Sequence, residues 1–323
     1  MDELELIRQI GSSEGPHEAR AKERTLGALR SAVGSSDHHR AAKRPRHVRG
    51  WLPALGAVLA IGLVISLMPV LGGRSQNAAA SLERMAAIAA SQLGASVRPG
   101  SYVYTKSIAR SLRTVAHITS GQTWAVFATV TREAWIGPDG SGRIIETTTD
   151  LSFPSEDDRQ AWEASGRPSL TSGGASSDES YRPGQLTFLD LSALPTNDEL
   201  LRDAIEERRI LPGPAGTAET FDILGDLLRE THASPALRAS LFRVAAGLSG
   251  IEVLGTLEDA IGRQGVVVAY SQGELRRELI FDPATSALLG EQTVRAGSRE
   301  AVEWAVYLDS GVVPSTSGRP EAR

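Results

Sequence analysis

The sequence predicts an α+β fold: a curved antiparallel β-sheet with packed helices, attached to one N-terminal transmembrane helix. Residues 51–71 of the 323-residue chain carry no formal charge, and a run of this length can cross a bilayer as a helix. Farther along, segments with strand-like alternation lie on both sides of a stretch with helical periodicity. Strands that flank a helical insertion are typical of one α+β domain.

The uncharged run favours membrane insertion. Its eleven Leu, Ile and Val residues each contribute roughly 0.3 to 0.6 kcal/mol at a helix centre, which sums to about 5 kcal/mol. Pro53 and Pro69 lie near its two ends, where a lost backbone hydrogen bond costs least. We therefore assign residues 51–72 to a transmembrane helix.

Two other interpretations compete with a retained membrane anchor. A buried helix of a soluble core would need an unusually long uncharged run. A cleaved signal peptide would use Ala78–Ala80 as its processing site, but signal peptides have a short basic leader and an apolar core of about 7 to 15 residues. Here some fifty residues precede the run, so a retained anchor is preferred.

Positive charge near the run predicts its orientation. Five Lys or Arg residues precede it closely, and only Arg74 follows it closely. The positive-inside rule therefore predicts a single-pass protein of the cell membrane, with residues 1–50 in the cytoplasm and the C-terminal part outside the cell. The basic residues and the first residue of the run are expected at the membrane interface, where they meet anionic lipid headgroups: Arg40, Lys43, Arg44, Arg46, Arg49 and Trp51.

Composition excludes some classes of partner and anchor. Of 34 basic and 39 acidic side chains, residues 1–50 hold ten and seven, which leaves 24 and 32 for the rest. The mildly acidic remainder gives no electrostatic case for nucleic-acid binding. Because Cys is absent, the chain has neither a disulfide nor a lipidated cysteine, and packing must stabilise the exported domain.

The cytoplasmic tail, residues 1–50, is predicted to be partly helical. Residues 2–10 and 17–33 each place apolar side chains on one helical face, and a breaker-rich segment separates them. Neither helix has enough apolar surface to fold alone. The tail is therefore either a loosely ordered leader or a segment that orders on a protein partner.

The rest of the chain divides into three parts. Residues 73–100 are expected to form a helical connector, and residues 101–311 an extracytoplasmic α+β domain. Residues 152–184 are rich in Pro, Gly, Ser and acidic side chains, which predicts a mobile surface loop within that domain. Residues 312–323 are expected to be a disordered tail.

Within the domain, strand signals precede and follow the helical ones. Thr196 or Asn197 is placed to cap the first helix, and Ser234 with Pro235 is typical of the start of the third. The predicted strands cover residues 102–108, 124–131, 143–149, 251–257, 266–270, 275–281, 288–294 and 302–308, and the predicted helices lie near residues 200–205, 221–228 and 235–244.

Several segments carry a resemblance to a known family: residues 1–6, the run FDILGDLL at 221–228, residues 234–238, Gly255, and ELIFDPAT at 278–285. Over most of its length the chain resembles an uncharacterised single-pass membrane protein family of high-GC Gram-positive bacteria. Members are often encoded beside sigma factors, which implies a regulatory, anti-sigma-like role. The family has no assigned catalytic residues to transfer.

A second resemblance concerns architecture alone. A helix followed by a curved meander with inserted helices is similar to the half-open barrels of periplasmic lipoprotein carriers and of regulators that sense envelope lipids. Fold does not carry function, so this likeness supplies a hypothesis only. It suggests a groove for lipid or another hydrophobic ligand, which the aromatic residues of the strands would line if they were not core: Tyr102, Tyr104, Trp124, Trp135, Phe281 and Trp304.

No motif of catalytic or metal-binding quality stands out. Residues 11–15 match the G-x-S-x-G string of hydrolases, but they lie in the tail without a preceding strand. His117 and His232 are the histidines outside the tail, and two isolated imidazoles are more typical of surface positions than of a metal site. The acidic groups 156–158, 178–179 and 258–259 lack the spacing of a calcium loop. We expect no enzyme, no cofactor and no metal.

Two functional hypotheses remain. In the first, the protein is a regulatory, signal-coupling membrane protein whose tail binds a cytoplasmic protein such as a sigma factor, while the outer domain acts as a sensor. Against it, the tail is short and lacks the His and Cys zinc signature of many anti-sigma domains. In the second, the outer domain is an envelope module that binds a lipid or hydrophobe, and the helix only anchors it.

Overall fold

The computed structural model describes residues 68–321, except residues 95, 117–122, 171–174, 208–212, 231 and 299. The predicted tail, most of the predicted transmembrane helix and all six membrane-interface residues lie outside the described residues. Among the helices of the described part, none combines the length and the apolar character that a bilayer span requires. The assignment of residues 51–72 to the membrane therefore stays a prediction.

The described part is built on one antiparallel sheet of nine strands. The strand order is β4-β3-β2-β1-β9-β8-β7-β6-β5, so an N-terminal and a C-terminal meander meet where β1 pairs with β9. The strands are β1 Tyr102–Ala116, β2 Thr123–Ile136, β3 Gly142–Ser152, β4 Ser176–Tyr181, β5 Ile251–Glu258, β6 Gln264–Gln272, β7 Leu275–Phe281, β8 Leu288–Arg295 and β9 Ala301–Val313.

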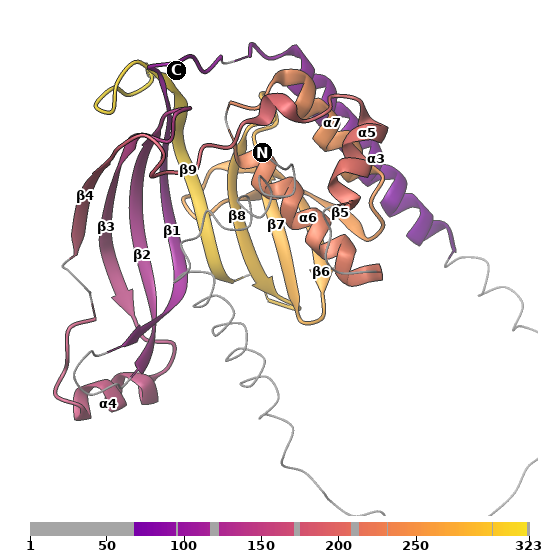
Figure 1. The fold of residues 1–323 in the computed structure, drawn as a ribbon. Coiled ribbons are helices and arrows are strands. Elements are labelled where there is room, and N and C mark those ends of the chain that lie inside the picture. Colours follow the sequence, from indigo (N-terminus) through magenta and orange to yellow (C-terminus); the bar gives the residue numbers. More distant parts are fainter. Residues whose placement is uncertain are drawn as a thin grey trace, which may run out of the picture.

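Helices before, within and between the two meanders complete an α+β fold, which confirms the predicted class (Figure 1). Asn197 caps α5 by accepting hydrogen bonds from the backbone N–H groups of Glu199 and Leu200, and Ser234 caps α7 with Pro235 in its first turn. The helices are α3 Met68–Ser91, α4 Glu156–Ala164, α5 Asp198–Glu206, α6 Gly213–Arg229 and α7 Pro235–Ala246, with a 3₁₀ turn at Leu191–Ala193.

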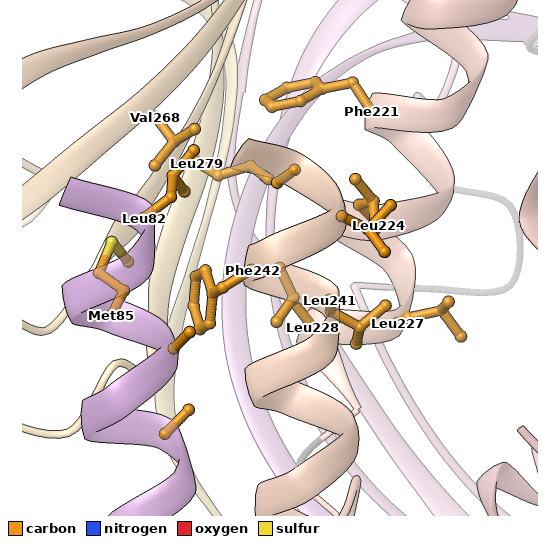
Figure 2. Packing of buried hydrophobic residues seen from close by; sticks show 14 of the residues in the cluster. Leu82, Met85, Phe221, Leu224, Leu227, Leu228, Leu241, Phe242, Val268 and Leu279 are labelled. Atoms are coloured by element: carbon orange, nitrogen blue, oxygen red, sulfur yellow. The ribbon is translucent and has the colours of Figure 1, made fainter. Parts of the chain in front are cut away.

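The main hydrophobic core lies between these helices and the C-terminal meander (Figure 2). Helix α3 contributes Leu82 and Met85, which pack beside Phe242 of α7. Phe242 in turn meets Phe281 of β7 edge to face, with the ring centroids 5.1 Å apart. Helix α3 is therefore an integral part of the core, and Ala78–Ala80 lies within this helix.

The segment 152–184 is more regular than the sequence predicts. The expected loop 152–184 contains α4 and β4. Ser155 caps α4 and its first turn is acidic, which suits a helix N-terminus. Strand β4 consists of polar, largely exposed residues that pair with β3 at the sheet edge, so backbone hydrogen bonds rather than apolar burial define it.

The C-terminal residues also have defined contacts. Strand β9 extends to Val313, and the chain then turns back over the N-terminal meander. The indole N–H of Trp135 donates to the backbone oxygen of Gly318 at 2.7 Å, and Arg319 lies 2.9 Å from the Glu133 carboxylate. The described part of the tail, expected to be disordered, is thus held against β2 by two polar contacts.

Candidate functional site

Several polar side chains converge on Arg229, the last residue of α6. Its guanidinium donates to both carboxylate oxygens of Glu291 on β8, at 2.8 and 3.0 Å. It also donates to the Tyr307 hydroxyl on β9 at 2.6 Å and to Asp226 at 2.9 Å. We call Arg229, Asp226, Glu291 and Tyr307 the Arg229 cluster.

Electrostatics favour an ionised Glu291 and a neutral Tyr307 near neutral pH. Burial alone would raise the pKa of Glu291, but the charge and hydrogen bonds of Arg229 outweigh it and hold the pKa below its ordinary value. Burial, followed by the Glu291 charge, raises the pKa of Tyr307. Tyr307 therefore stays a neutral hydroxyl, which donates to Glu291 at 2.8 Å. The ion pair between Arg229 and Glu291 and the hydrogen bonds to Tyr307 tie the end of α6 to β8 and β9.

His232 lies just beyond α6 and is not the surface residue that the sequence predicts. Its side chain is only 7% exposed. The ring stacks on Phe188 with centroids 5.1 Å apart, and Nε2 lies 2.8 Å from the backbone oxygen of Leu189. The other candidate, His117, is outside the described residues. No group of three or more metal-ligating side chains occurs within the described ranges.

A hollow with a volume of about 420 Å³ opens on another part of the surface. Trp304 is the one predicted groove aromatic that lines it, together with polar and charged groups. We call it the Trp304 hollow, and its lining residues are Arg110, Glu258, Asp259, Ala260, Gln292, Glu300, Ala301 and Trp304. Its volume suits a small ligand, and its lining suits a polar one.

The other aromatic candidates are mainly core residues. Tyr104 and Trp135 pack against each other with centroids 5.1 Å apart, and both are essentially inaccessible. Phe281 belongs to the main core. The sequence could not separate Trp304 from these, because all of them lie in strands and a strand signal alone does not show which face of the sheet is covered.

The acidic pairs have structural partners. Asp259 accepts hydrogen bonds from the backbone N–H groups of Ile261 and Arg263, and its second oxygen accepts from the Arg263 side chain at 2.7 Å. Asp178 pairs with Arg143 at 2.6 Å, and Glu156 pairs with Arg159. These carboxylates hold turns, strands and a helix in place.

The space between the helices and the C-terminal meander is nearly filled. The apolar cavity there measures about 10 Å³ and is lined by core residues such as Leu82, Phe221 and Leu279. This is roughly the space of one water molecule. A lipid chain would have to displace core side chains to enter at this place.

No family model, curated protein or solved structure matches the chain.

Proposed function

We propose that the chain is a single-pass membrane protein that couples an extracytoplasmic α+β domain to a cytoplasmic tail, in the manner of an anti-sigma regulator. The observation that carries the proposal is the position of α3. It begins at Met68, inside the predicted transmembrane segment, and one face of it, with Leu82, Met85, Ala86 and Ala89, lies in the domain core. On this proposal, one helix joins the predicted membrane segment to the core.

This connection suits signal coupling better than simple anchoring. Helix α3 has 24 residues, about 36 Å at 1.5 Å per residue. It packs along α7 and against β5, and Glu83 approaches Arg243 of α7 at 3.6 Å. Because packed interiors transmit displacement, a shift of α7 or β5 moves the end of the helix that enters the membrane. A mere anchor would work equally well through a flexible linker.

The cavities favour the regulator over the alternative of a lipid- or hydrophobe-binding module. The apolar space under the helices is about 10 Å³, far below the several hundred cubic ångströms of a typical ligand pocket. The larger Trp304 hollow has a predominantly polar lining. A ligand sensed there would therefore be small and polar, in contrast to the hydrophobe that the sequence suggested.

Single-cysteine labelling tests the proposed orientation, and the absence of native Cys makes every label site-specific. We expect Ser177→Cys, on the exposed edge strand β4, to react with a membrane-impermeant maleimide in intact cells. Ser13→Cys in the tail should react only after the membrane is permeabilised. Labelling of Ser13→Cys in intact cells, or protection of Ser177→Cys, would contradict the orientation.

A further inference from the structure

His232 and Glu230 lie together at the end of α6, next to the Arg229 cluster. The Nδ1 atom of His232 is 3.6 Å from a carboxylate oxygen of Glu230. Nδ1 is buried and has no hydrogen-bond partner within the part of the chain that the structure describes. The Glu230 side chain remains 35% exposed, which gives protons a path from solvent to the pair.

Hydrogen-bond chemistry fixes where the protons of this histidine lie. The Leu189 oxygen, 2.8 Å from Nε2, is a carbonyl and can only accept, so Nε2 carries a proton and donates. A neutral imidazole has one N–H, which leaves a lone pair on Nδ1. Nδ1 and an ionised Glu230 are then two acceptors that face each other. One additional proton converts this mismatch into a charge-assisted hydrogen bond.

We propose that His232 and Glu230 form a proton-binding pair that fastens the segment 182–197 to the turn between α6 and α7 when the pair is protonated. This segment connects β4 to α5, and it meets His232 through the Leu189 carbonyl and the stacked ring of Phe188. The inference goes beyond the proposed function, because it makes the conformation of the domain depend on pH regardless of which protein the tail binds.

Charged neighbours from every adjoining element act on the pair. Burial raises the pKa of Glu230 above its ordinary value of 4.5, and Asp226 of α6 adds to this effect. His232, Arg229 of α6 and Arg132 of β2 act in the opposite direction. From the 182–197 segment, Asp190 also feels the charge of His232, although its hydrogen bonds with Ser192 are the main cause of its lowered pKa.

The sign of the pH effect follows from the raised pKa. A carboxyl whose pKa is higher in the folded state contributes stability that is fully present below its ordinary value, about 4.5, and is lost as the pH rises through the folded value. The contact between the segment and the turn is therefore strongest in acid and weakens toward neutral and alkaline pH.

Hydrogen exchange of residues 185–194 in the full-length protein, purified in mild detergent, tests the proposal. After correction for intrinsic exchange, protection should fall from pH 5 to pH 8, by at most about tenfold for each pH unit over which the linked proton titrates. Peptides from β7 in the same samples report whether the whole domain has loosened.

Two variants break the proton-binding pair in different ways. Glu230→Gln supplies an amide that donates to Nδ1 at every pH, so protection should be high and nearly the same at pH 5 and pH 8. His232→Gln removes the imidazole that shares the proton of Glu230. Glu230 can still be protonated there, but its proton no longer orients a ring against Leu189 and Phe188, so protection should be low at both pH values. Glu252→Gln, an exposed carboxylate on β5, should keep the wild-type profile. A flat wild-type profile, or a wild-type slope in both variants, would overturn the proposal.

Discussion

Leu82→Ala should lower the free energy of unfolding by about 3 kcal/mol, the largest effect expected of a single truncation in α3. The side chain of Leu82 is 1% exposed. It extends from α3 toward β6 and β7, near Val268 and Leu279 (Figure 2). Removing its side chain enlarges the small cavity that Leu82 lines. The lost stability is therefore the sum of the transfer free energy of the removed atoms and the cost of the larger cavity. Urea unfolding followed by circular dichroism measures it.

Leu93→Ala is the matched control for this prediction. Leu93 follows α3 directly and is 99% exposed, so the same truncation there should change stability by less than about 0.5 kcal/mol. If α3 transmits signals through its packing, Leu82→Ala should also alter the signalling output while Leu93→Ala leaves it unchanged. Equal unfolding midpoints for the two variants would show that α3 is not part of the core.

Arg229→Met should destabilise the domain by about 2 kcal/mol at pH 7. The substitution keeps an apolar stem of similar length but leaves Glu291 and Tyr307 without their cationic partner. Loss of one member of a buried ion pair can cost 3 to 5 kcal/mol. We expect less here because the side chains of Arg229 and Glu291 are 34% and 29% exposed, which allows solvent to screen the charge that remains.

The pH dependence distinguishes this charge effect from a packing effect. In the wild type, the lowered pKa of Glu291 contributes stability above its ordinary value of 4.5, and this is lost as the pH falls through the folded value. The difference in stability between wild type and Arg229→Met should therefore shrink below about pH 4.5. Arg84→Met, on an exposed part of α3, should differ little from wild type at either pH. A pH-independent difference for Arg229→Met would mean that lost packing dominates.

Local chemistry explains which parts of the fold the sequence predicts well. The start of α7 depends on Ser234 and Pro235, and both signals act within one turn. Turn residues separate the strands of the C-terminal meander, as Gly273 with its positive φ does between β6 and β7. Strand β1 continues to Ala116, eight residues past the predicted end at Ile108. Its second half mixes apolar and polar residues without a clear local strand signal, and pairing with β2 holds it in the strand.

The candidate sites were harder to predict, because they join residues that are distant in the sequence. Arg229 contacts Glu291 and Tyr307, which are 62 and 78 positions away in the sequence. No local spacing of residues predicts such contacts. His232 contacts Leu189 across 43 positions, so its burial depends on a tertiary packing that a single isolated histidine does not reveal. The Trp304 hollow likewise depends on how the β5–β6 turn lies relative to β9.

The most direct test of signal coupling is to identify what the protein binds through its tail. The full-length protein and a variant lacking residues 1–33 would be extracted from the native membrane under mild crosslinking, and the captured proteins identified by mass spectrometry. The account predicts that a sigma factor is recovered with the full-length protein and is lost when the tail is removed. Recovery of the same lipids and envelope proteins with both forms, and of no sigma factor with either, would contradict it.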